Sequence, residues 1–181
     1  PQIKEKGERY LLLESLAKDN HIPIKYISQW DYIKDDKLLL NCLHPPKDYD
    51  YSDANSYSTV LSLSYGELDM LLTGDLDDNG EKKIVELIKE TPDIKSDYDI
   101  LKVAHHGSKH SSDMNFLQLV KPELSLISCG KNNSYGHPHG EVLERLELVG
   151  SEVIATSESG AITIKTDGKR MRVEEFIKAV K

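Results

Sequence analysis

The sequence predicts an α/β fold, in which short strands alternate with helices within one domain. Two observations lead to this prediction. Apolar runs of strand length recur between residues 58 and 155, and stretches with the periodicity of amphipathic helices separate the later runs. The chain has 181 residues, of which 38% are hydrophobic and 30% charged, and this is enough for one core of ordinary size. We therefore expect residues 1–181 to form a single domain.

Each expected element follows from a local pattern. Tyr65-Gly66-Glu67 is typical of a hairpin turn between two strands, and Asp167-Gly168-Lys169 is a second turn signal near the end of the chain. Ile84 and Ile88 share one face of a predicted helix. In chain order we expect helix 8–19, strands 23–27, 37–42, 58–64 and 68–73, helix 80–90, strand 99–103, helix 112–119, strand 124–128, helix 139–149, strands 152–155 and 160–165, and a last helix 173–180.

Two of these strands end in residues of the types that bind metal ions in hydrolases. Strand 68–73 breaks at a glycine, so that Asp75 emerges at the carboxyl edge of the sheet, where α/β proteins place their chemistry. Strand 99–103 delivers His105 and His106 to the neighbouring position. Carboxylates and imidazoles hold one or two Zn²⁺ or Mn²⁺ ions for hydrolysis. Each motif alone is more typical of a turn or of solvated histidines, but their joint order favours a metal site.

A third strand ends in the same way. Strand 124–128 leads into the loop 130–139, which contains His137 and His139. We interpret His139, and also His44 ahead of two prolines, as structural or surface residues. Three strand exits that carry Asp or His are harder to explain by turn chemistry than any one of them.

Three blocks of sequence together form a specific pattern. They are Leu-Leu-Thr-Gly-Asp-Leu-Asp at 71–77, Leu-Lys-Val-Ala-His-His-Gly-Ser-Lys-His-Ser-Ser at 101–112 and Asn-Asn-Ser-Tyr-Gly-His-Pro-His at 132–139. This pattern resembles the carboxyl-terminal metallo-β-lactamase-like domain of the ComEC family of DNA-uptake channel proteins, and the resemblance extends over most of the chain. It implies that the α/β fold is part of a metallo-β-lactamase-like αββα sandwich.

The resemblance also assigns roles to individual residues. It implies that Asp75 is the carboxylate that bridges two metals, that His106 is the late histidine ligand, and that His105 is the less favoured ligand of the pair. The implied cofactors are Zn²⁺ or Mn²⁺, with two ions in a complete domain and none necessarily bound here. His137 is expected either to help bind metal or to contact a scissile phosphate, and contacts with the substrate are expected from Ser108 and Asn133.

One departure from the family limits what this chain would do alone. The early motif H-x-H-x-D-H, which supplies most metal ligands in such hydrolases, is absent from the sequence. Asp75 and His106 are fewer than the three or four protein ligands usual for a metal. We therefore expect a fragment that lacks the N-terminal half of its domain, and a degenerate domain that has lost catalysis is the alternative. A sheet without its partner layer would expose an apolar face, through which self-association is expected.

Three classes of function remain open. The leading interpretation is a metal-dependent phosphodiester hydrolase of nuclease type, incomplete or inactive in this chain, within a DNA-uptake channel protein. A related metallo-hydrolase acting on a cell-surface phosphodiester, such as a phosphorylcholine ester, is the second. The third is a non-catalytic domain that binds DNA or docks on the channel. The resemblance implies DNA, single-stranded or duplex, and the channel portion as partners, in a parent protein of the cytoplasmic membrane with this domain on the extracellular face.

Charge and cysteine content add two further expectations. The net charge of −8 argues against tight binding of nucleic acid by the bulk surface, because such binding depends on Lys and Arg. Lys102, Lys109 and Lys131 lie close in sequence to the predicted site and form either a small basic rim or ordinary solvated charges. Cys42 and Cys129 both fall in apolar strand contexts, where we expect free thiols.

Overall fold

Seven strands form one mixed sheet in the order in which they occur along the chain. The structure is a computed structural model that describes residues 6–48 and 53–177. Strands β1 to β4 run antiparallel to one another, whereas β4 to β7 are parallel. The predicted α/β class is thereby confirmed. The strands are β1 (Tyr32–Asp35), β2 (Leu38–His44), β3 (Val60–Tyr65), β4 (Leu68–Leu72), β5 (Ile100–Lys102), β6 (Leu124–Ile127) and β7 (Glu152–Ala155).

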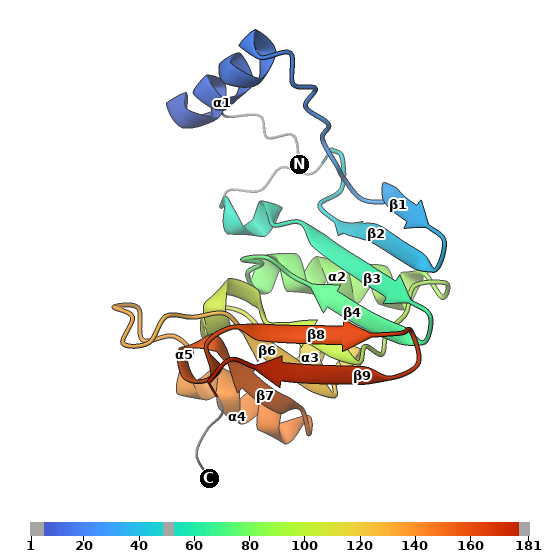
Figure 1. Ribbon diagram of the computed structural model, residues 1–181, viewed down its shortest axis with the longest axis vertical. Coiled ribbons are helices and arrows are strands. Elements are labelled where there is room, and N and C mark those ends of the chain that lie inside the picture. Colours follow the sequence, from blue (N-terminus) through green and yellow to red (C-terminus); the bar gives the residue numbers. More distant parts are fainter. Residues whose placement is uncertain (1–5, 49–52, 178–181) are drawn as a thin grey trace.

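The sheet is the middle of three layers (Figure 1). Helices α2 (Asp78–Glu90), α3 (Met114–Val120) and α4 (Gly140–Leu148) cover one face, and the hairpin of β8 (Ile162–Thr166) and β9 (Met171–Glu175) lies across the other. The layering agrees with an α/β sandwich. The remaining elements are α1 (Glu8–Asp19), η1 (Asn55–Tyr57), η2 (Ala104–Gly107) and α5 (Thr156–Ser159).

The parallel strands are continuous apolar runs because an apolar cluster lies on each face of the sheet. Leu101 points toward the helices, where it joins the fully buried Phe116 and Leu146. Its neighbour Ile100 points to the other face and packs with Leu124 beneath the β8–β9 hairpin. A strand buried on both faces needs apolar side chains at successive positions.

Helix α2 anchors the segment that follows η2. Its cap residue Asp77 accepts a hydrogen bond from the Gly80 backbone N–H at 2.9 Å, which satisfies a free donor of the first turn. One turn further, the carboxyl group of Glu81 is buried and accepts the backbone N–H groups of Ser112, at 2.5 Å, and Asp113, at 2.8 Å. The loop between η2 and α3 is therefore fixed to α2.

Two predicted elements are wrong. Residues 23–27 form no strand, and the strand that precedes β2 is β1, which joins β2 through a tight turn at Asp36, where φ is 45°. The segment 23–27 alternates like a strand, but no other strand in the described part of the chain pairs with it. The predicted helix 173–180 is instead strand β9, because Val173 pairs with Ile164 and packs against the sheet. Residues 178–180 of that prediction lie outside the described residues.

The amino-terminal part of the chain presents apolar side chains to solvent. Helix α1 stands apart from the sheet (Figure 1), and the only buried residue that it contributes is Ala17. The sequence predicts an exposed apolar face of the sheet. This face is only partly exposed, because the β8–β9 hairpin covers strands β4 to β7. Among the described residues, no helix is long and apolar enough to cross a membrane. The exposed apolar side chains are Leu11, Leu12, Leu13, Leu16, Ile22, Ile24, Tyr26, Ile27, Trp30, Tyr32 and Ile33.

Candidate functional site

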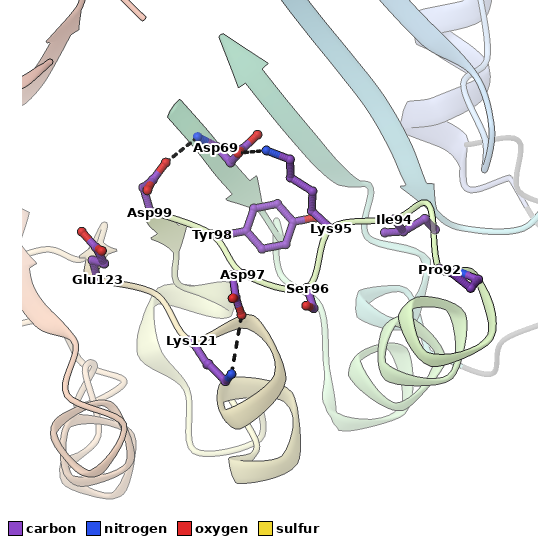
Figure 2. A pocket seen from close by; sticks show the side chains of 10 residues that line it. All are labelled: Asp69, Pro92, Ile94, Lys95, Ser96, Asp97, Tyr98, Asp99, Lys121 and Glu123. Atoms are coloured by element: carbon purple, nitrogen blue, oxygen red, sulfur yellow. Dashed lines mark hydrogen bonds and ion pairs between the residues drawn. The ribbon is translucent and has the colours of Figure 1, made fainter. Parts of the chain in front are cut away.

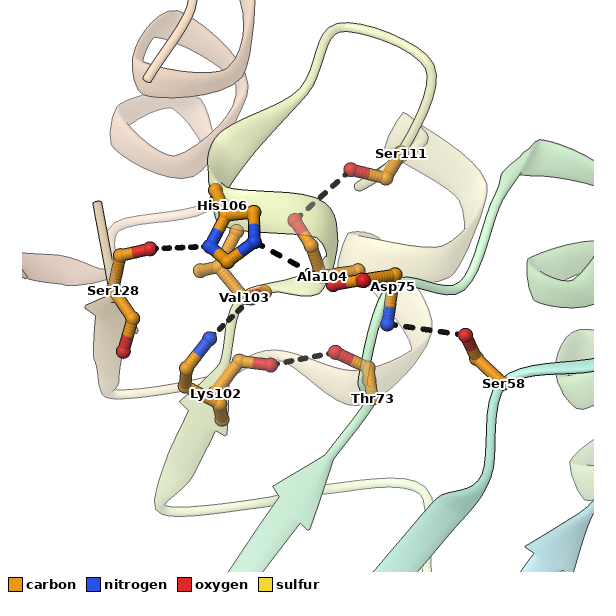
Figure 3. Close-up of polar contacts among 9 residues, drawn as sticks. All are labelled: Ser58, Thr73, Asp75, Lys102, Val103, Ala104, His106, Ser111 and Ser128. Carbon is orange, nitrogen blue, oxygen red and sulfur yellow. Dashed lines mark hydrogen bonds and ion pairs between the residues drawn. The ribbon is translucent and has the colours of Figure 1, made fainter. Parts of the chain in front are cut away.

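The carboxyl ends of β4 and β5 are held side by side. The Thr73 hydroxyl donates to the carbonyl oxygen of Lys102 at 2.6 Å, and the His105 backbone N–H donates to the carbonyl oxygen of Gly74 at 3.0 Å. Ser58 Oγ accepts the backbone N–H of Asp75 at 3.1 Å (Figure 3). These bonds place Asp75 and the two histidines of η2 at the same edge of the sheet, as the sequence predicts.

Asp75 and His106 face each other across this edge. The distance from Asp75 Oδ1 to His106 Nε2 is 3.8 Å, which is too long for a hydrogen bond. It is near the spacing of two ligands on one metal ion, which is roughly 3.3 Å for bond lengths of about 2.0–2.1 Å. Both side chains remain about half exposed.

The tautomer of His106 suits a ligand role. Its Nδ1 lies 2.6 Å from the carbonyl oxygen of Ser128, which can only accept, so Nδ1 carries the proton (Figure 3). In the neutral imidazole the lone pair is then on Nε2, which points toward Asp75. A metal-binding histidine usually donates its second ring N–H to a carbonyl or carboxylate in this way.

The backbone of η2 is strained at the two histidines. His105 and His106 have φ values of 47° and 58°, in the left-handed region that residues with a Cβ rarely adopt. Such conformations persist where surrounding contacts enforce them, and they cluster at functional sites. The Nδ1 atom of His105 is buried and has no hydrogen-bond partner among residues 6–48 and 53–177, although its backbone is held by Gly74. The strain and the unpaired nitrogen favour a functional role for this turn.

Two further histidines join the cluster from the β6–α4 loop. The His137 ring centroid lies 5.9 Å from that of His105 and 6.2 Å from that of His106. We interpreted His139 from the sequence as a structural or surface residue. Its ring centroid lies 4.9 Å from that of His137. Burial, together with repulsion from the other histidines, lowers the pKa of His137 and keeps its imidazole neutral near pH 7. The sequence pattern did not predict this contact between His139 and His137.

The turn at Gly107 brings the β6–α4 loop against η2. Gly107 has a φ of 80°, and its carbonyl oxygen accepts the His139 backbone N–H at 2.9 Å. A Cβ at Gly107 would lie 2.7 Å from Cβ of Pro138, closer than such atoms approach. Glycine is therefore required here for the two loops to meet.

Ser108 and Asn133 are both engaged within the protein. Ser108 is buried, with its hydroxyl 3.4 Å from the His110 backbone N–H. The Asn133 amide donates to the carbonyl oxygens of Gly130 and His137, at 2.9 and 2.5 Å. Their expected contacts with substrate stay predictions, and the structure shows that both hold loops of the site in place.

Lys102 contributes a half-buried positive charge below the site. Its ammonium donates to the carbonyl oxygen of Val103 at 2.9 Å (Figure 3). Burial lowers the pKa of Lys102, and the nearby Asp75 carboxylate opposes this effect. Lys109 and Lys131 are exposed, so the expected basic rim has one inner and two outer members.

The described residues do not complete a metal site. Among them, no group of three or more His, Cys, Asp or Glu side chains is arranged to hold a metal ion. Asp75 and His106 fit two positions of a coordination sphere, and the usual number of protein ligands is three or four. The donor set therefore fits a Zn²⁺ or Mn²⁺ ion in type and orientation, but not in number.

A hollow of about 650 Å³ lies at the opposite end of the sheet, before β5 and β6 (Figure 2). Three of its carboxylates, those of Asp69, Asp97 and Asp99, already contact other groups of the protein. Asp69 forms an ion pair with Lys95, and Lys121 lies 3.8 Å from Asp97. Asp99 accepts the backbone N–H of Asp69 at 2.6 Å. These contacts give the hollow a structural role in joining the strand ends.

Curated proteins of three bacteria are similar to this chain. It is 36% identical to ComE operon protein 3 of Bacillus subtilis over 146 residues, which are 81% of the chain and 18% of that protein. It is 32% identical to Recombination protein 2 of Haemophilus influenzae over 175 residues, 97% of the chain and 20% of that protein. Competence protein ComA of Neisseria gonorrhoeae is 33% identical over 82% of the chain and 21% of its own length. The chain thus spans about one fifth of these relatives, and no protein-family model matches it.

Proposed function

Since the chain belongs to the ComEC family of competence proteins, we propose that it is part of a metal-dependent phosphodiester hydrolase domain, of nuclease type, that acts on DNA during uptake. The observation that carries the proposal is the pair of Asp75 and His106, with Nε2 of the histidine turned toward the carboxylate at 3.8 Å. The strained turn that presents His106 supports it.

Each residue of the site has a definite task in this proposal. Asp75 and His106 would hold a Zn²⁺ or Mn²⁺ ion, and the carbonyl oxygen of Ser128 keeps the ring nitrogen of His106 available. A bound ion of this kind lowers the pKa of water and polarises a phosphoryl oxygen. The neutral His137 would donate its ring N–H to a phosphate oxygen or take the proton of the attacking water. Lys102 adds positive charge beneath the same edge and favours an anionic substrate.

The proposed activity is tested by cleavage of a fluorescent DNA oligonucleotide with Mn²⁺ or Zn²⁺. The assay compares this chain with a longer polypeptide that contains it, and the wild type with Asp75→Asn and His106→Gln. Asp93→Asn and His21→Gln, which alter exposed residues elsewhere, are matched controls. We expect metal-dependent cleavage that falls at least 100-fold with either site variant and is unchanged in the controls, since each variant removes a metal ligand. Cleavage that survives both variants, or no cleavage by either polypeptide, contradicts the proposal.

One observation favours a second candidate function. Because no three His, Cys, Asp or Glu side chains among the described residues are arranged to hold one metal ion, the chain by itself fits a non-catalytic domain that binds DNA or docks on the channel portion of its parent protein. Binding of DNA that does not change with Asp75→Asn, without cleavage in the longer polypeptide, would support this candidate. The family relationship gives no support to the phosphorylcholine ester as substrate.

The surroundings of the domain are part of the same proposal. We infer a parent protein in the cytoplasmic membrane, with this domain on its extracellular face, where incoming DNA would reach it. We also infer that the isolated chain self-associates through the apolar side chains of α1 and of residues 22–33. Light scattering during size-exclusion chromatography tests this: we expect a dimer or larger species, and Leu12→Glu should shift it to the monomer. A monomeric wild type would contradict self-association.

A further inference from the structure

An aromatic side chain stands at the tip of the loop that completes the site. Tyr135 is 76% exposed and belongs to the β6–α4 loop, which projects from the edge of the molecule (Figure 1). An exposed tyrosine alone carries no function, because single apolar side chains are common on protein surfaces. What distinguishes Tyr135 is how its ring is oriented and what lies next to it.

Hydrogen bonds hold the loop backbone in place at Tyr135 and His137. The side-chain oxygen of Asn133 accepts the backbone N–H groups of Tyr135, at 3.2 Å, and of His137, at 3.0 Å. Gly136, between the two rings, has a φ of 73° and so turns the chain back on itself. The two rings consequently stack, with centroids 5.7 Å apart and an interplanar angle of 20°.

The stack continues from Tyr135 to the candidate metal ligand. The ring of His137 is also nearly parallel to that of His106, at 23° and 6.2 Å between centroids. His106 in turn lies 3.8 Å from Asp75. Three rings of similar orientation therefore lead from solvent to the position of the proposed chemistry, and most of the outermost ring remains open to a ligand.

We propose that Tyr135 stacks on the base next to the scissile phosphate and thereby selects single-stranded over duplex DNA. The proposal rests on the proposed function. Stacking on an aromatic side chain requires an unpaired, splayed base, which a single strand supplies and a duplex does not. Stacking also suits a chain of net charge −8, because it adds affinity for DNA without positive charge. Lys131 is the only Lys or Arg in residues 130–139.

Binding of fluorescein-labelled oligothymidylate, followed by anisotropy at low ionic strength with a chelator present, tests this role. Stacking of one base on one ring makes Tyr135→Ala weaken binding roughly 5- to 150-fold. Tyr135→Phe keeps the ring and should bind like the wild type. Leu148→Ala is the matched control, because Leu148 is 77% exposed at the carboxyl end of α4, away from the site. A duplex of the same length should bind more weakly and be insensitive to Tyr135→Ala.

Three results would overturn the proposal: equal binding by wild type and Tyr135→Ala, an equal loss in Leu148→Ala, or a duplex that binds as tightly and with the same dependence on Tyr135. Absence of any binding by the wild type would overturn it as well. Failure of the proposed hydrolase is a separate result, since the chelator removes any metal-dependent cleavage from this binding assay. Tyr135-dependent binding without cleavage would reject the hydrolase alone, and cleavage with Tyr135-independent binding would reject the stacking alone.

Discussion

Replacing Glu81 with Gln changes how the stability of the domain depends on pH. The carboxyl group lies in the core and accepts the backbone N–H groups of Ser112 and Asp113, one on each oxygen. Burial raises the pKa of Glu81 to about 8, although the two N–H groups oppose the effect, and the nearby Asp78 and Asp113 carboxylates add to it. The folded state therefore prefers the protonated carboxyl group.

The size and sign of the effect follow from this shift. The unfolded chain releases the Glu81 proton near pH 4.5 and the folded protein near pH 8, so the folded state holds one more proton between these values. The wild-type free energy of unfolding then falls as pH rises through this range, by up to about 5 kcal/mol in total. Glu81→Gln does not titrate, but its amide NH₂ leaves one backbone N–H unpaired, which costs roughly 1–3 kcal/mol at every pH.

Urea denaturation at several pH values between 4.5 and 9 measures both quantities. The variant should be less stable than the wild type near pH 5 and equal or more stable near pH 9. Comparing the two proteins at each pH isolates Glu81, because groups such as His44 and His137 titrate in both. A stability difference that stays constant from pH 5 to pH 9 would refute the reasoning, since it would mean that Glu81 has the same pKa in the folded and unfolded chain.

Three other predictions concern the loops and the core. Gly107→Ala should lower the free energy of unfolding by roughly 2–3 kcal/mol in thermal denaturation, because the new Cβ meets Pro138. Gly136→Ala should cost only about 1 kcal/mol, because Gly136 has a φ of 73° but no described atom within 4 Å of the new Cβ. Equal losses in the two variants would contradict the close approach of Gly107 and Pro138. Phe116→Ala empties a fully buried position and should cost about 3–5 kcal/mol in the same assay, and a loss below about 1 kcal/mol would contradict its place in the core. Asn133→Ala should speed amide hydrogen exchange at residues 135 and 137 while leaving β6 protected. Unchanged exchange at both residues would contradict a role of the Asn133 side chain in holding this loop.

The elements that the sequence predicted well are those whose pattern is local. Strands β4 to β7 are apolar on both faces, and α2 has its apolar side chains on one face, so these elements appear within about two residues of their expected bounds. Segment 173–180 has a helical periodicity, but pairing with β8 places residues 173–175 in β9. Tertiary contacts of this kind cannot be predicted from a short stretch of sequence.

The site was predictable in part for the same reason. Asp75, His105 and His106 follow directly from two parallel strands, whose carboxyl ends must share an edge of the sheet. His139 could not be found in this way, because it reaches the cluster only through the turn at Gly107 and the loop that Asn133 holds together. The resemblance to the ComEC family is confirmed by the relatives, and the roles of the site residues stay predictions.

The most direct test of the central claim is the affinity for Mn²⁺, measured by isothermal titration calorimetry on this chain and on a longer polypeptide that contains it. If Asp75 and His106 are ligands, at least one of the two polypeptides binds Mn²⁺ saturably, and Asp75→Asn weakens that binding more than tenfold while Asp93→Asn does not. Absence of binding by both polypeptides, or equal affinities of the wild type and Asp75→Asn, would contradict a metal centre at this edge of the sheet.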